Sequence, residues 1–177
     1  AMLFARLHAR FVQGLRVTGR EHIPTSRCPG PLVVVANHTS GLDPMLIQTA
    51  CPFEIKWMMA KDMQNPDLAW LWELADVISV NRVDVAGGNG ETVQRGNDSA
   101  AARTAIKHLK SGGVVGVFPE GRIAPLGRIV PFASGVGLLV SRGRARVLQV
   151  IVEGTARTES MTAALLVPAR ARLRFLP

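Results

Sequence analysis

Short apolar runs alternate with helical patterns along most of the chain. Leu32–Ala36 is a continuous apolar run, bounded by Pro29-Gly30-Pro31 before it and by polar residues after it. This pattern predicts a strand buried on both faces. Similar runs predict strands at 55–60, 77–80, 114–118 and 147–152, and the alternation of basic with apolar residues predicts another at 170–175.

Helical patterns fill most of the intervals between these strands. Asp43 as N-cap and Pro44 as first helical residue predict a helix that runs to about Ala50, where Pro52 closes it. Further helices are expected at 65–75, 99–110 and 135–142, and the glycine-rich, polar segment 86–98 is predicted to be a mobile loop. The fold class that follows is α/β, a single domain with a central, mostly parallel β-sheet flanked by helices.

The first residues predict a basic amphipathic helix. Leu3, Leu7 and Phe11 recur every four positions, with Arg6 and Arg10 between them. Two compatible interpretations stay open. The helix packs on the domain's own core with its arginines in solvent, or it lies on a membrane surface.

Composition narrows the class of partner. The 177 residues include 21 Lys and Arg against 13 Asp and Glu, so the net charge of +8 favours an anionic partner, such as a lipid headgroup, a phosphorylated substrate, a membrane surface or nucleic acid. No uninterrupted apolar run approaches the ~20 residues that a membrane-spanning helix needs. Nucleic acid ranks last, because the chain has no Tyr and no recognisable nucleic-acid-binding motif.

The two cysteines argue against a zinc site or a disulfide framework. Cys28 and Cys51 form no CxxC pair and lie in no histidine-rich cluster, so we expect no bound metal and a reducing compartment. Three tryptophans, Trp57, Trp70 and Trp72, are expected to pack in the core, with an acyl-chain groove or the bilayer interface as the alternatives.

An imidazole and a carboxylate lie five positions apart just after the first buried strand, at His38 and Asp43. Across a tight turn Asp43 can accept the Nδ1 proton, which leaves Nε2 free to take a proton from a substrate alcohol. The alternative is purely structural, because Asp43 is also a good N-cap and a histidine after a strand is often simply packed. Ser40 has no nucleophile-elbow motif around it and is expected to be structural.

A second polar cluster follows the strand predicted at 114–118. Gly121 allows a ligand to approach the backbone closely, Arg122 suits a phosphate, and Glu120 is a candidate to orient that arginine or the substrate. The alternative is an ordinary turn with a solvated ion pair.

Arg82, just after the strand predicted at 77–80, is a second phosphate candidate, although a single arginine at a strand end is more often a surface residue. His38, Arg82 and Glu120 all follow predicted strands, and open α/β sheets bind ligands at the carboxyl edge of their strands.

These motifs, in this order and spacing, resemble the glycerophospholipid acyltransferases, the family of 1-acylglycerol-3-phosphate acyltransferases. The chain carries the His-x4-Asp motif of that family at His38 and Asp43, an arginine after an apolar strand at 78–82, and the motif FPEG at 118–121. The resemblance covers roughly residues 15–154.

The resemblance implies a reaction and a set of roles. His38 would be the general base and Asp43 its orienting partner, and the substrate site would be formed by Asn37, Arg82, Glu120, Gly121 and Arg122. The reaction would move a fatty acyl group from acyl-CoA or acyl carrier protein to the free hydroxyl of a lysophospholipid, in phospholipid biosynthesis or remodelling. Apart from that acyl donor as co-substrate, no cofactor is expected.

Two departures from the family's motifs leave the acceptor headgroup and the donor contacts open. Arg122 followed by Ile123, and the later segment 152–154, resemble members that reacylate lysophosphatidylethanolamine. Gln149 occupies the place where the family's fourth motif usually has a proline, which weakens any inference about donor contacts there.

The expected organisation is an amphipathic N-terminal helix at 1–14, a candidate for membrane contact, followed by an acyltransferase catalytic domain at 15–177. The resemblance implies a peripheral protein on the cytoplasmic side of the membrane that does not bind nucleic acid. The alternative is a catalytically inactive, membrane-surface lipid-binding domain of the same fold. Intact His38 and Asp43 argue against that alternative.

Overall fold

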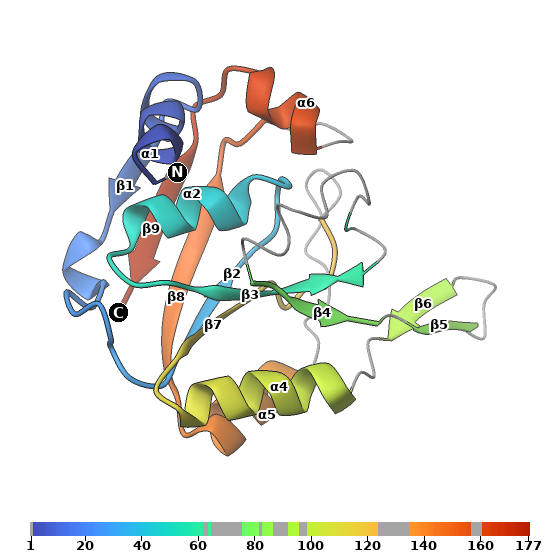
Figure 1. Cartoon of the computed structure of the whole chain (residues 1–177). Helices are drawn as coiled ribbons and strands as arrows, with labels where there is room; N and C mark the ends of the chain where they lie inside the picture. Colours follow the sequence, from blue (N-terminus) through green and yellow to red (C-terminus); the bar gives the residue numbers. More distant parts are fainter. Residues whose placement is uncertain are drawn as a thin grey trace.

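The computed structural model describes residues 2–61, 64, 76–81, 83–86, 92–95, 99–123, 135–156 and 161–177 (Figure 1). Within these residues a seven-stranded sheet has the order β1-β9-β8-β2-β7-β3-β4. The strands are β1 Arg16–Thr18, β2 Leu32–Ala36, β3 Lys56–Ala60, β4 Ile78–Val80, β7 Val114–Val117, β8 Arg146–Glu153 and β9 Arg172–Leu176. All neighbouring strands are parallel except β8 and β9, so the predicted α/β class with a mostly parallel sheet is confirmed.

Helices cover both faces of the sheet (Figure 1). They are α1 Met2–Phe11, α2 Asp43–Ala50, α4 Ser99–Lys110, α5 Gly135–Gly143 and α6 Met161–Leu166, with a short 3-10 helix at Arg20–His22. α1, α2 and α6 lie on one side and pack into a first core with β8 and β9. α4 and α5 lie on the other side and close a second, smaller core.

β2 is the centre of the sheet and belongs to both cores. Val33 packs with α4 and α5, whereas Val34 faces the opposite core, and both side chains are 0% exposed. This is the arrangement that the continuous apolar run predicts, because neighbouring side chains of a strand point to opposite faces. β2 pairs in parallel with β7 on one side and with β8 on the other, so the carboxyl ends of all three strands meet at one edge.

α4 ends as its sequence predicts. Gly112 adopts a φ of 86°, its amide donates to the Leu109 carbonyl, and the amide of Gly113 donates to His108. This pair of bonds is the Schellman motif, and the left-handed residue it needs is most easily a glycine.

Two expectations need correction. The segment predicted as a loop at 86–98 contains a strand, because β5 Val83–Ala86 pairs antiparallel with β6 Thr92–Arg95. The β-branched residues Thr92 and Val93 favour a strand. The loop prediction instead gave more weight to the glycines around them. The N-cap of α2 is Leu42 and not Asp43, which is the first helical residue and directs its carboxylate back into the preceding turn. The predicted helix at 65–75 lies outside the described residues.

α1 forms as predicted, but a different side of it packs on the core. Ala9 is 2% exposed, whereas Leu3, Phe4, Leu7 and Phe11 are between 47% and 75% exposed. The helix thus packs on the core with Arg6 and Arg10 in solvent, as one interpretation predicts, but Leu3, Leu7 and Phe11 take no part in that packing. A small residue such as Ala9 allows the helix backbone to approach its neighbours closely, and this leaves the larger apolar side chains in solvent. None of the described helices is long and apolar enough to span a bilayer.

The two cysteines provide a direct test of the fold. Cys51 is buried in the first core, and this burial raises the pKa of its thiol to about 12, whereas Cys28 is exposed. Because only the thiolate reacts, we expect a disulfide reagent at pH 8 to label one thiol in the native chain and both after denaturation. The Cys28→Ser variant should then show no rapid native labelling. Rapid reaction of Cys51 in that variant would contradict the packing described for this core.

Candidate active site

The turn between β2 and α2 is organised around the carboxylate of Asp43. This side chain is 0% exposed, and its Oδ2 accepts hydrogen bonds from the backbone amides of Thr39, at 2.6 Å, and Ser40, at 2.8 Å. The Thr39 hydroxyl adds a longer contact of 3.3 Å to the same carboxylate. A buried carboxylate needs such donors, because its desolvation costs several kcal/mol if it is left without them.

The same carboxylate holds the imidazole of His38. Nδ1 of His38 lies 3.0 Å from Oδ2 of Asp43, as the five-residue spacing predicts. The His38 side chain is 15% exposed, so the ring is neither sealed in the core nor free in solvent. No hydrogen bond joins Nε2 to any residue of the described part of the chain. The pair therefore has the geometry of an oriented general base, with its second nitrogen available.

Three stacked rings fix the plane of that imidazole. The His38 and Phe118 ring centroids are 4.0 Å apart with planes inclined by 14°, and Trp57 stacks on Phe118 at 4.9 Å and 13°. Trp57 is 7% exposed, which confirms its expected place in the core. Trp70 and Trp72 lie outside the described residues.

A glycine makes room for this stack. Trp57 on β3 pairs in register with Gly116 on β7, and a Cβ added at Gly116 would lie 2.4 Å from the Trp57 ring. The Trp57 indole thus lies directly against the backbone of β7 at Gly116, where any side chain would clash with it. Neither Gly116 nor the ring stack is visible in the sequence alone, because both depend on the register of β3 against β7.

The loop after β7 brings Glu120 to the same place. Oε1 of Glu120 accepts a hydrogen bond of 3.2 Å from the backbone amide of His38, so the polar clusters that follow β2 and β7 meet as predicted. Oε2 of Glu120 is buried and has no partner among the described residues. Gly121 has a φ of 66° with open space around it, and the Arg122 side chain is exposed and makes no ion pair with the described residues.

Three further residues from the sequence analysis are Asn37, Ser40 and Arg82. The side-chain amide of Asn37 donates to the Val152 carbonyl at 2.8 Å and accepts from the Val152 amide at 2.7 Å, so it ties the end of β2 to β8. Its role in substrate binding stays a prediction. Ser40 is 2% exposed, and its Oγ accepts a bond from the Leu42 amide. Arg82 lies outside the described residues.

Thr155 is a further part of the site that sequence reasoning missed. Its hydroxyl is 2.7 Å from the Thr39 hydroxyl, which contacts Asp43 in turn, and the residue is 7% exposed. The end of β8 therefore supports the Asp43 turn from the side opposite Glu120. Only the alignment of β8 beside β2 reveals this contact, since the two threonines are far apart in sequence.

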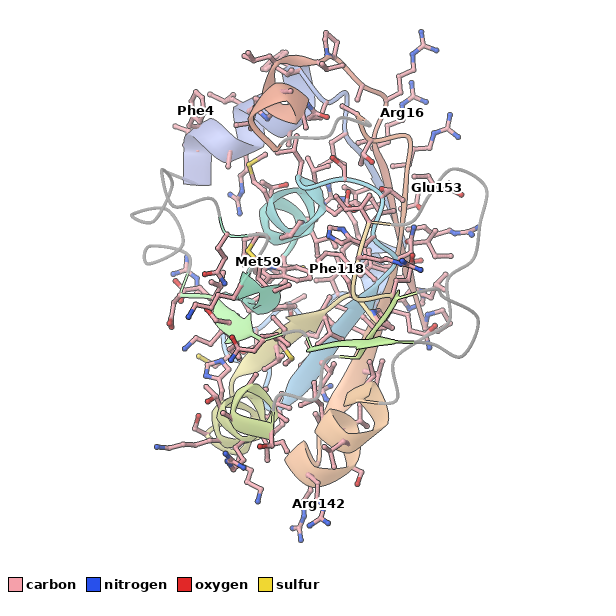
Figure 2. All side chains as sticks on the ribbon, turned by 90° about the vertical axis from the view of Figure 1, so that its right-hand side faces the viewer. Phe4, Arg16, Met59, Phe118, Arg142 and Glu153 are labelled. Atoms are coloured by element: carbon pink, nitrogen blue, oxygen red, sulfur yellow. The ribbon has the colours of Figure 1, made fainter. Side chains whose placement is uncertain are left out.

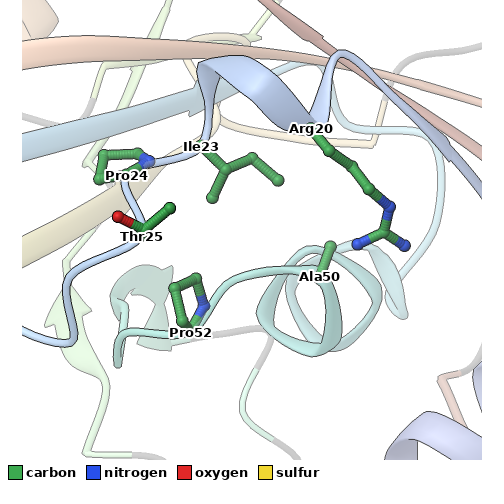
Figure 3. Close-up of a pocket in the computed structure, with 6 residues that line it drawn as sticks. All are labelled: Arg20, Ile23, Pro24, Thr25, Ala50 and Pro52. Atoms are coloured by element: carbon green, nitrogen blue, oxygen red, sulfur yellow. The ribbon is translucent and has the colours of Figure 1, made fainter.

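Figure 2 views the molecule from the right-hand side of Figure 1 and places Phe118 near the centre of the view, with Arg142 at the lower end of the molecule. A separate shallow pocket of about 170 Å³ lies beside the other end of α2, and Figure 3 shows its lining by Arg20, Ile23, Pro24, Thr25, Ala50 and Pro52. Because His38 precedes the first turn of α2, this pocket does not belong to the His38 site. Among the described residues no cluster of three or more His, Cys, Asp or Glu side chains is placed to hold a metal ion.

Comparison with known proteins agrees with this architecture. The profile of the family described as Acyltransferase matches residues 14–153. A 1-acyl-sn-glycerol-3-phosphate acyltransferase of Borreliella burgdorferi is 33% identical over 109 residues, which are 59% of this chain and 37% of that protein. The alpha form of the enzyme from Mus musculus is 26% identical over 180 residues, covering 97% of this chain and 57% of that protein.

A solved structure shares the fold. The 1-acyl-sn-glycerophosphate acyltransferase PlsC from Thermotoga maritima superposes with a TM-score of 0.71 at 22% identity, over 99% of this chain and 67% of that one. The chain thus has the acyltransferase fold of that enzyme. Since the family profile spans most of its length, the chain belongs to the Acyltransferase family. It spans about a third and somewhat over half of the length of the two curated relatives.

The contact between Gly116 and Trp57 can be tested by stability alone. We expect Gly116→Ala to lower the free energy of unfolding by about 1–3 kcal/mol, because the added methyl group must displace a ring that is packed on both sides. Gly137→Ala is the matched control, since Gly137 is an exposed position of α5 and nothing lies within 4 Å of its added Cβ. That change should be neutral or stabilise by up to about 1 kcal/mol. Equal denaturation midpoints for the two variants would contradict the stack.

Proposed function

We propose that this chain transfers a fatty acyl group from a thioester donor to the free hydroxyl of a lysophospholipid, with 1-acylglycerol-3-phosphate as the first acceptor to test. The observation that carries the proposal is the His38–Asp43 pair, with Nδ1 bound at 3.0 Å and Nε2 without a partner in the described residues. The relatives are named for this acceptor, which supports the choice.

In the proposed reaction His38 acts on the acceptor. Nε2 takes the proton of the acceptor hydroxyl while its oxygen attacks the thioester carbonyl, and Asp43 stabilises the imidazolium that forms. The carbon–sulfur bond then breaks and the thiolate leaves with the electron pair of that bond. The proton on His38 can return to the thiolate, which restores the neutral base.

No acyl intermediate on the protein is needed. Because a thiolate is a stable leaving group, the substrate alcohol itself can serve as the nucleophile. Two hydroxyls follow His38 in the sequence, but the Thr39 hydroxyl contacts the Asp43 carboxylate and Ser40 is buried with its oxygen accepting a bond from the Leu42 amide. The donor is proposed to be acyl-CoA or acyl carrier protein, with no further cofactor and no metal.

The acceptor is proposed to bind against the loop after β7. Oε2 of Glu120 is a buried oxygen without a partner in the described residues, and a hydroxyl of the glycerol would satisfy it. Arg122 carries an exposed guanidinium on the same loop, next to the conformationally free Gly121, and suits the phosphate. Arg82, Asn37 and Gly121 stay candidates for further contacts.

We also propose that the protein works as a peripheral protein on the cytoplasmic side of a membrane, in phospholipid biosynthesis or remodelling. The exposed apolar side chains of α1, with Arg6 and Arg10 between them, support contact with an anionic lipid surface. Both cysteines are free thiols, the state that a reducing compartment maintains.

The base is tested by incubating the purified chain with lysophosphatidic acid and either acyl-CoA or acyl carrier protein loaded with the same chain. We expect His38→Ala to reduce kcat by about 100-fold to 10,000-fold, the usual contribution of a general base. His22→Ala is the control, because His22 is a partly exposed residue of the 3-10 helix outside the site. Full activity in His38→Ala would remove the proposed mechanism. A wild-type chain that binds lysolipid without turnover would favour the inactive lipid-binding alternative.

The phosphate contact predicts a change in KM. Arg122→Ala should raise KM for lysophosphatidic acid by about 10-fold to 100-fold with a smaller change in kcat, the loss expected for a hydrogen bond to a charged group. Arg142→Ala removes a similar exposed guanidinium from α5 at the far end of the molecule and should leave KM unchanged (Figure 2). Equal KM values for the two variants would exclude Arg122 from the acceptor site.

A further inference from the structure

Exposed apolar side chains gather at one end of the molecule. Eight large apolar side chains of the described residues are exposed, and six of them lie on α1 or at the end of α6. These six, which we term the terminal apolar surface, are Leu3, Phe4, Leu7, Phe11, Leu166 and Val167. Leu166 is 83% exposed, the highest value of the set. Such a gathering on one part of a protein marks an interaction surface.

The two elements are bonded to each other although they come from opposite ends of the chain. Nε2 of Gln13, a residue 0% exposed, donates to the carbonyls of Ala164, at 3.1 Å, and Val167, at 3.2 Å. A ring nitrogen of His8 lies 2.8 Å from the Leu165 carbonyl. α6 therefore has a fixed place beside α1, and Figure 1 shows both helices at the same end of the molecule.

Gly14 allows this close approach. Its φ is 52°, and an added Cβ would lie 2.9 Å from the Ala169 carbonyl oxygen. The Ala169 amide also donates to the Val12 carbonyl at 3.1 Å. The chain after α6 is thus held against the end of α1 by its backbone as well as by Gln13.

The two chain segments that carry this surface have only basic residues as charged side chains. Residues 2–20 and 161–177 together contain seven arginines and not one Asp or Glu, in a chain with 13 acids in total. Arg6 and Arg10 are exposed on α1 between the apolar residues, and Arg170 is exposed just beyond the end of α6. Apolar side chains with flanking arginines fit the interfacial region of an anionic bilayer. A second copy would instead bring arginines against arginines.

α6 follows in sequence the end of β8, which contacts the turn of the proposed active site. β8 leads from the sheet to Thr155, whose hydroxyl contacts Thr39 in the turn that holds Asp43, and α6 begins six residues later.

We infer that α6 is a second lipid-contacting element, in which Leu166 and Val167 enter an anionic bilayer surface beside the apolar side chains of α1. The inference rests on the proposed function for its biological context and extends it. In the proposed function the membrane contact belongs to α1 alone, whereas here the bound orientation is set by both helices, joined through Gln13.

The test is sedimentation of the whole chain with vesicles of phosphatidylcholine containing phosphatidylglycerol, without any substrate. Leu166→Ser/Val167→Ser should lower the vesicle partition coefficient at least about tenfold, because two apolar side chains then no longer enter the bilayer. Leu138→Ser/Val147→Ser is the matched control, because it makes the same two changes at exposed positions on α5 and β8. The control should bind like wild type.

Further arms separate this inference from the proposed reaction. His38→Ala should bind vesicles like wild type, so a chain that proves to be no acyltransferase still gives an interpretable binding result. Phe4→Ser/Leu7→Ser should weaken binding through α1. Loss in that variant with wild-type binding of Leu166→Ser/Val167→Ser would overturn the role of α6. Equal loss in the control, or no vesicle binding together with a dimer mass in solution, would overturn it as well.

Discussion

The buried carboxylate of Asp43 is the interaction on which the rest of the site depends. It accepts bonds from the backbone amides of Thr39 and Ser40 and lies 3.0 Å from Nδ1 of His38, all within one turn. A buried carboxylate is costly unless donors surround it, so the turn and the imidazole have one arrangement in which this side chain is satisfied. The same carboxylate therefore stabilises the turn and orients the imidazole of His38.

Neighbouring strands hold that turn from several directions. β7 contributes Phe118, which stacks on the imidazole, and Glu120, which binds the His38 amide. β8 contributes the Val152 backbone, bound twice by Asn37, and Thr155. β2 lies between β7 and β8 in parallel, so their carboxyl ends meet where ligands bind in open α/β sheets. The order of the strands therefore brings contacts from β7 and β8 to the two sides of the His38 turn.

The features that could be predicted from the sequence are those set by residues close to one another in the chain. The apolar run of β2 and the spacing of His38 and Asp43 sit within a few residues, and both have the predicted form. The stack of Trp57 over Gly116 could not be found, since it depends on how β3 is aligned with β7. The side of α1 that packs was mistaken because periodicity identifies an apolar stripe without saying what the stripe contacts.

The central claim is that Asp43 holds His38 with Nδ1 protonated and Nε2 free, and nitrogen NMR of the histidine side chains tests it most directly. The chain has four histidines, and the spectrum of His38→Ala assigns the signal of interest. We predict that the neutral ring of His38 carries its proton on Nδ1 and that Asp43→Asn disturbs this state. A His38 ring protonated on Nε2, or a spectrum unchanged in Asp43→Asn, would contradict the account.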